Sequence, residues 1–178
     1  MPRNMHILPT NHTLEALMKP KELIFSETGI VTSISNFDER GCTLLFEVQT
    51  EDNTVVNFII NPNTYFFQQQ PISTGMSIIG FFDANAPVPL IYPPRYQALV
   101  VAAVPRRSNL IFDWFNQDLI NYNGTLKLNL SSNTEIIMAN GQPFHGNIAN
   151  HYLLVQYSTT TRSIPAQTTP SKIIVMCG

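Results

Sequence analysis

Short apolar runs separated by turn residues recur along the chain and predict strands nearly everywhere. In the run 54–60, the side chains of Val56, Phe58 and Ile60 are expected on one side and that of Asn57 on the other, the period of a strand with one buried face. Other runs rich in β-branched and aromatic residues have strand length and polar or glycine boundaries: 28–34, 42–48, 76–82, 97–104, 110–115, 124–130, 151–157 and 172–177. Only 13–18 and 117–122 are candidates for a helical turn. The pattern therefore predicts an all-β chain.

The two halves of the chain share an order of strands. Residues 54–64 lie over residues 124–134 without a gap, 70 positions further on, and each copy ends an alternating strand in Asn-Thr. Two prolines in each half also have matching spacings and precede an apolar strand: Pro89 and Pro94, and Pro165 and Pro170. The common order of strand, Asn-Thr, glycine, strand, proline-containing loop and strand predicts an internal duplication.

Five short strands in each copy, with a long loop before the last, resemble the OB-fold, a small five-stranded Greek-key barrel. The resemblance implies two tandem OB-like barrels, 25–104 and 105–178, after a loosely ordered arm of residues 1–24. Gly80 is expected to relieve crowding at a barrel corner. The alternative is a single β-sandwich built from the same strands. The stretch 76–96 also resembles an uncharacterised family of Gram-positive bacteria, which has no known function.

The low content of charge sharpens this picture. Charged residues make up only 12% of the chain, about half the usual share for soluble domains, and the net charge is −2. Two small barrels have much surface for their volume, so a chain with few charges is expected to bury a face between them. The run 98–104 is apolar at all seven positions, which predicts a strand buried on both sides at that junction.

The stretch 83–96 is the strongest candidate for a binding surface. Four prolines stiffen it, so it would lose little entropy on binding a ligand. Its tyrosines offer flat faces with polar tips, and its arginine can stack or pair with an anion. The candidate contact residues are Asp83, Tyr92, Arg95 and Tyr96. The alternative is structural, with Leu90, Ile91 and Tyr92 packed down as a plug over a barrel end or against the other repeat.

Residues suited to catalysis or metal binding form no recognisable constellation. No nucleophile elbow and no phosphate-binding glycine loop occur, and neither Cys42 nor Cys177 has an electropositive sequence setting. Zinc needs about four converging ligands, whereas the histidines lack metal-ligand spacing. We therefore expect a protein that is not an enzyme and has no metal site and no cofactor.

Nucleic-acid binding is the second functional class considered, because OB-like barrels often bind single strands or oligosaccharides. Phe112, Trp114 and Tyr122 are the candidates for base stacking. Charge argues against this class: residues 1–105 carry a net charge of −4 and residues 106–178 only +2, which is too little to neutralise phosphates.

Association with protein is the remaining expectation. Only four lysines occur, Lys19, Lys21, Lys127 and Lys172, and lysine is the residue that usually protects exposed strand edges. We expect a homo-oligomer or a protein partner, with no membrane contact, in the cytoplasm. The predicted function is a non-catalytic binding or assembly module that acts through its Pro/Tyr-rich loop and its strand edges.

Overall fold

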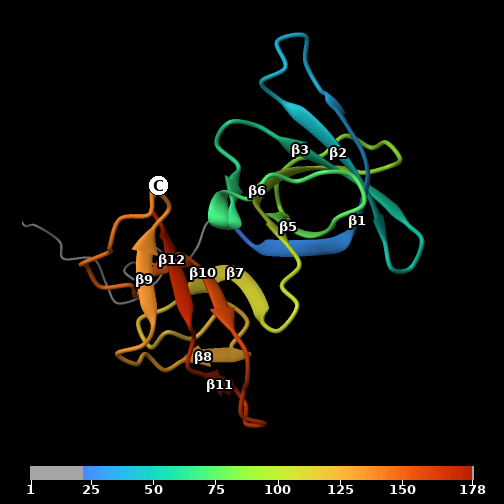
Figure 1. Cartoon of the computed structure of the whole chain (residues 1–178). Helices are drawn as coiled ribbons and strands as arrows, with labels where there is room; N and C mark the ends of the chain where they lie inside the picture. The colour runs from blue at the N-terminus through green and yellow to red at the C-terminus, as the bar shows by residue number, and fades with distance from the viewer. Residues whose placement is uncertain (1–21, 178) are drawn as a thin grey trace, which may run out of the picture.

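The computed structural model describes residues 22–177, which form two lobes built from strands (Figure 1). The predicted arm, 1–24, lies almost entirely outside the described residues, as does the candidate helical turn at 13–18. Within 22–177 the only helical segment is one 3-10 turn, η1 (Phe67–Gln69), and no helix there could cross a membrane. The prediction of an all-β chain is confirmed.

Five strands of the first lobe close into a barrel: β1 (Ile24–Asn36), β2 (Leu44–Thr50), β3 (Val55–Ile60), β5 (Ser77–Asp83) and β6 (Arg95–Ala103). Their order is β3-β2-β1-β5-β6 with antiparallel neighbours, and a parallel pairing of β3 with β6 completes the ring. A two-residue strand, β4 (Tyr65–Phe66), pairs with the end of β6. The closed ring rules out a single β-sandwich.

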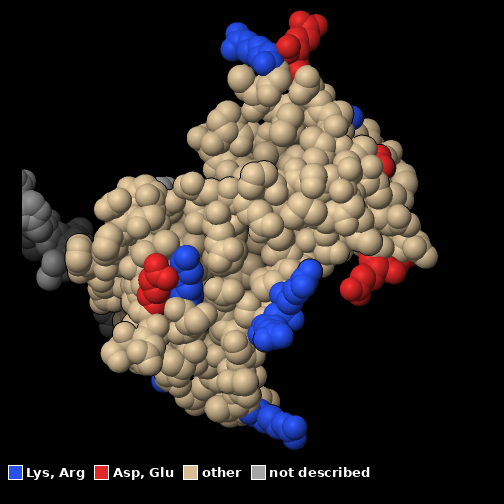
Figure 2. All heavy atoms as spheres, viewed as in Figure 1, with Lys and Arg blue, Asp and Glu red and all other residues tan. Residues whose placement is uncertain are grey.

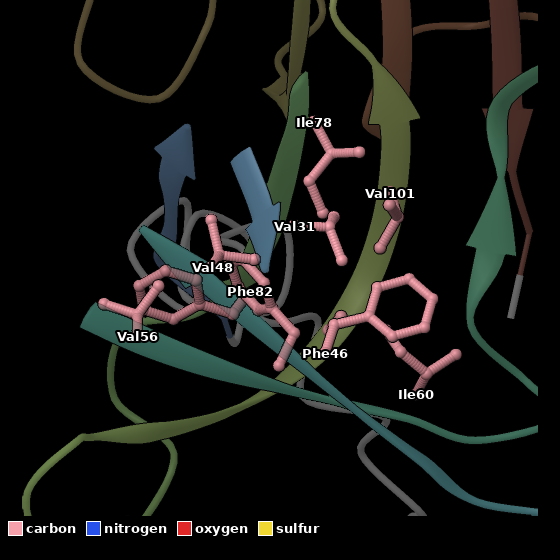
Figure 3. Packing of buried hydrophobic residues seen from close by; sticks show 10 residues of the cluster. Val31, Phe46, Val48, Val56, Ile60, Ile78, Phe82 and Val101 are labelled. Atoms are coloured by element: carbon pink, nitrogen blue, oxygen red, sulfur yellow. The ribbon is translucent and has the colours of Figure 1, made fainter. Parts of the chain in front are cut away.

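Apolar side chains from all five barrel strands meet in the interior (Figure 3). Phe58 of β3 is fully buried at its centre. A Cβ on Gly80 of β5 would lie 2.5 Å from the Phe58 ring, so only glycine leaves room for that ring. This confirms the crowding role expected for Gly80.

The second lobe holds the remaining strands: β7 (Asn109–Phe115), β8 (Leu126–Leu128), β9 (Glu135–Met138), β10 (His151–Tyr157), β11 (Ala166–Thr168) and β12 (Lys172–Met176). Four of them form a sheet in the order β7-β10-β12-β9, and β8 pairs in parallel with β11. The pairing of β8 with β11 corresponds to the parallel contact of β3 with β6, and that of β9 with β12 to β4 with β6.

Matching threonines fix the register between the halves. Thr64 Oγ1 donates to the Ala98 carbonyl at 2.9 Å, and Thr134 Oγ1 donates to the Pro170 carbonyl at 2.7 Å. Each threonine also receives a backbone N–H bond from the residue three positions earlier. The predicted alignment of 54–64 with 124–134 is therefore confirmed.

The same register corrects the alignment of the prolines. Ala98, not Pro94, corresponds to Pro170, so the predicted match of Pro89 and Pro94 with Pro165 and Pro170 is wrong by four residues. The threonine and the residue whose carbonyl accepts its hydrogen bond are 34 positions apart in the first half and 36 positions apart in the second. Spacing between prolines alone could not reveal this shift.

The second lobe has no strand in the place of β2, where only isolated bridges remain among the described residues. A Cβ on Gly29 of β1 would lie 2.2 Å from the Gln49 carbonyl oxygen, so only glycine allows β1 and β2 to approach so closely. In the register of the repeat, traced from β1 through β5 and β6 and then back from β12 through β10 to β7, Asp113 corresponds to Gly29. Residues 117–122, a candidate helical turn, instead form a turn and isolated bridges to β7 and β8.

The lobes meet across a continuous apolar core. β6 supplies both sides: Ala98 and Val101 face the barrel interior, whereas Val100 and Ala102 pack toward the second lobe. The partners on the second lobe are Phe112, Leu154 and Ile174, all buried. The prediction that this apolar run is buried on both sides at the junction is confirmed for Ala98–Ala102, whereas Val104 is exposed.

Candidate functional site

The loop between β5 and β6, residues 84–94, presents a cluster of exposed apolar side chains at its tip: Val88, Leu90, Ile91 and Tyr92. Leu90 is completely exposed, and Tyr92 is 75% exposed. Asp83 is the last residue of β5, and its Oδ1 accepts a hydrogen bond of 2.9 Å from the Asn85 N–H in the loop. The alternative interpretation, a plug packed over a barrel end, is wrong because these side chains stand away from the core.

Tyr96 was predicted to belong to the same contact set, but it serves the barrel core. Its ring stacks on Phe82, with centroids 4.0 Å apart and planes 10° apart, and it also lies near Phe58. Tyr96 is the second residue of β6 and faces inward, whereas Arg95 faces outward, because side chains alternate along a strand. The contact set therefore loses Tyr96.

Substitution by alanine separates these two tyrosines. We expect Tyr96→Ala to lower the free energy of unfolding by about 2 kcal/mol, because it removes a stacked, half-buried ring. Tyr92→Ala should change it by less than about 0.5 kcal/mol, since the side chain is exposed. Urea unfolding of both variants measures the difference. Equal losses of stability would contradict this division of roles.

Arg95 lies at the base of the loop in a polar row that crosses the outside of the barrel. Its register partner is Asn57 on β3, and the partner of Asn57 is Glu47 on β2. The Arg95 guanidinium lies 5.6 Å from the centroid of the Phe37 ring in the β1–β2 loop. Arg95 Nε and Asn57 Oδ1 are both buried without a hydrogen-bond partner among the described residues. A buried polar atom without a partner costs free energy, so a bound water or ion that supplied the missing partner would stabilise this row.

Phe37 and Asn57 are site residues that sequence reasoning missed. Phe37 precedes a run of charged residues, which indicates a turn but gives no sign that the ring lies beside Arg95. Asn57 was correctly expected on the face opposite Val56 and Phe58, but its closeness to Arg95 depends on the parallel contact of β3 with β6. A polar residue inside an otherwise apolar strand was the available signal.

The candidate base-stacking residues do not form one surface. Phe112 is buried between the lobes, where its ring lies 6.1 Å from that of Phe81 and 5.8 Å from that of Tyr152. Trp114 is half-buried and contacts Tyr152 edge to face, at 5.2 Å between centroids. Only Tyr122 is exposed. Of the three candidates, Tyr122 is thus the one whose ring is open to solvent, whereas Phe112 is enclosed.

Asp113 is a buried carboxylate in β7, beside Trp114. Burial raises its pKa above the usual value for an aspartate, although hydrogen bonds from the Trp114 N–H, at 2.8 Å, and from Asn121 and Tyr122 oppose the shift. The folded chain thus binds a proton here more readily than the unfolded chain does. This contribution to stability is present in acid and is lost as the pH rises through the raised pKa.

Asp113→Asn should therefore raise the melting temperature at pH 7. The amide keeps an oxygen for the Trp114 N–H but carries no charge to desolvate. The gain should shrink as the pH falls from the raised pKa toward that of an ordinary aspartate, where the wild-type side chain is neutral too. Thermal unfolding of both proteins across this pH range measures it; a gap that is independent of pH would contradict the assignment.

Comparison with known proteins assigns none of these residues. No protein-family model matches the chain, and no curated protein matches it. Within residues 22–177, no group of three His, Cys, Asp or Glu side chains is placed to hold a metal ion. The candidate site therefore consists of the exposed loop tip and, beneath it, the row that contains Arg95 and Asn57.

Proposed function

We propose that this protein is a non-catalytic binding and assembly module whose contact surface is the tip of the loop 84–94. The observation that carries the proposal is the exposure of its apolar side chains, above all Leu90 and Tyr92. Single exposed apolar residues are ordinary on protein surfaces, whereas several together mark an interaction site.

The construction of the loop supports binding. Pro87, Pro89, Pro93 and Pro94 restrict its backbone, and the Ile91 N–H donates to the Pro89 carbonyl at 2.9 Å. A stiff loop loses less conformational entropy when it binds than a mobile one does. An aromatic side chain with a polar tip, such as Tyr92, is typical of the central contacts in protein interfaces.

The partner that we propose is protein, in the first instance a second copy of this chain. A protein surface can cover apolar side chains from water, while the low charge of the chain opposes association only weakly. The base-stacking alternative has less support because Phe112 is enclosed between the lobes.

Light scattering after size-exclusion chromatography tests this function. We expect the wild-type chain to associate as its concentration rises and Leu90→Ser/Tyr92→Ser to stay monomeric. Ile164→Ser is the matched control: Ile164 is 97% exposed and, in the register of the repeat, occupies the position of Tyr92 in the second lobe. It should associate like the wild type. A wild-type chain that is monomeric at every concentration would overturn assembly through this loop.

A further inference from the structure

A second candidate site is a cleft of about 570 Å³ where the two lobes meet. Its walls come from η1, the start of β5, the end of β6, the linker to β7, and Gln156 on β10. This volume lies within the range of about 300–1,000 Å³ found for pockets that bind small molecules, and such pockets often lie between domains. The cleft shares no residue with the loop 84–94.

Arg106 is the only charged residue that lines the cleft, and no acidic residue lines it. Among residues 22–177 the one ion pair joins Lys172 to Glu135, so no carboxylate neutralises Arg106 there. Figure 2 shows basic side chains where the chain passes from the barrel to the second lobe. The cleft therefore presents one unpaired positive charge.

The remaining polar groups in the cleft are mostly primary amides. Gln68, Gln70 and Gln156 line it, and Gln156 Nε2 donates to Ser108 Oγ at 2.9 Å, which fixes this amide at the wall. Amides both donate and accept hydrogen bonds, as hydroxyl groups do. Beside them lie apolar groups from Met76 and Pro105, which suit the C–H face of a sugar ring.

The backbone beside the cleft departs from its usual conformation. Gln68 has φ of 58° and Gln69 has φ of 50°, left-handed values that favour glycine. Such a conformation in a residue with a side chain costs on the order of 1 kcal/mol and is found most often at functional sites. Here it places a glutamine at the cleft in a position where glycine would be the easier choice.

We propose that this cleft binds a small hydroxylated anion: a sugar that carries one carboxylate or one phosphate group. The guanidinium of Arg106 matches the geometry of either anion. The glutamine amides bind the hydroxyl groups, and the apolar side chains contact the ring. One positive charge, with no second one in the lining, selects a ligand with a single anionic group.

Titration of the full chain with three probes tests this site: glucuronate, glucose 6-phosphate and glucose. Calorimetry gives the affinity, and NMR of the glutamine side-chain amides locates the binding. We expect at least one anionic probe to bind and glucose to bind about tenfold more weakly or not at all, because a charged hydrogen bond is lost. The anion that binds more tightly identifies its chemical source.

Arg106→Gln should weaken binding of the anion by about tenfold or more. Arg107→Gln is the matched control. It removes the same charge from the neighbouring residue, which does not line the cleft. It should change the affinity by less than about twofold, because Arg107 does not line the cleft and makes no direct contact with a ligand bound there. The proposal is overturned if no probe shifts the glutamine amides at millimolar concentration, if glucose binds as tightly as the anions, or if both variants lose affinity equally.

Discussion

Gly80→Val should destabilise the chain by about 3 kcal/mol, because the barrel has no room for a side chain at this position. Even a single Cβ there would lie 2.5 Å from the ring of Phe58. That ring is fully buried and is enclosed by Phe82 and Tyr96, so it cannot move aside without displacing both.

The second lobe contains the solution to the same packing problem. In the register of the repeat, Gly80 corresponds to Val155 and Phe58 to Leu128, and both of these residues lie in the core of the second lobe. In the second lobe, Val155 on β10 is larger than the corresponding Gly80, and Leu128 on β8 is smaller than the corresponding Phe58. The two lobes therefore fill the same space with opposite combinations of side chains.

Phe58→Leu should consequently rescue Gly80→Val. Alone, Phe58→Leu leaves a cavity and should cost about 1 kcal/mol. In the double variant the valine occupies that cavity, so its total loss should be smaller than the sum of the two single losses by about 2 kcal/mol. Urea unfolding of the four proteins completes the cycle. Additive losses would mean that Gly80 is required for another reason, such as the twist of β5.

The fold follows closely from alternation and register along the sequence. His151–Tyr157 is an observed strand with the predicted boundaries, and the predicted run 54–60 differs from β3 by one residue. Alternation is a local property that burial on one face imposes directly on a strand. The short strands β4, β9 and β11 contain too few residues to show a period, so they were not predicted as strands.

The site was less predictable because it depends on contacts that are distant in sequence. The loop 84–94 was identified from its prolines and tyrosines, and its tip is exposed. Sequence did not separate Tyr92 from Tyr96, because only the start of β6 decides which of them faces inward. The sequence also failed to predict that Phe112 faces the other lobe. The pattern of apolar residues in a strand is the same whether the buried face packs inside its own lobe or against the other lobe.

Adjacent residues on β6 should show how far the two lobes depend on each other. Val100 and Val101 are both fully buried, but Val100 packs between the lobes and Val101 packs inside the barrel. Aspartate at either position introduces a buried charge with no partner, which costs several kcal/mol. The same substitution on the same strand thus affects two different cores.

We expect Val101→Asp to prevent the barrel from folding, since the charge would lie inside a closed ring of strands. Val100→Asp should leave the barrel intact and weaken the contact between lobes, so that each lobe unfolds at its own temperature. Trp114, the single tryptophan, lies in the second lobe and reports on it by fluorescence, whereas circular dichroism reports on both lobes. The two signals should change together on heating the wild-type chain and separately in Val100→Asp. Coincident transitions in Val100→Asp, at the wild-type temperature, would mean that the shared core contributes little, because the buried face between lobes is what joins their stabilities.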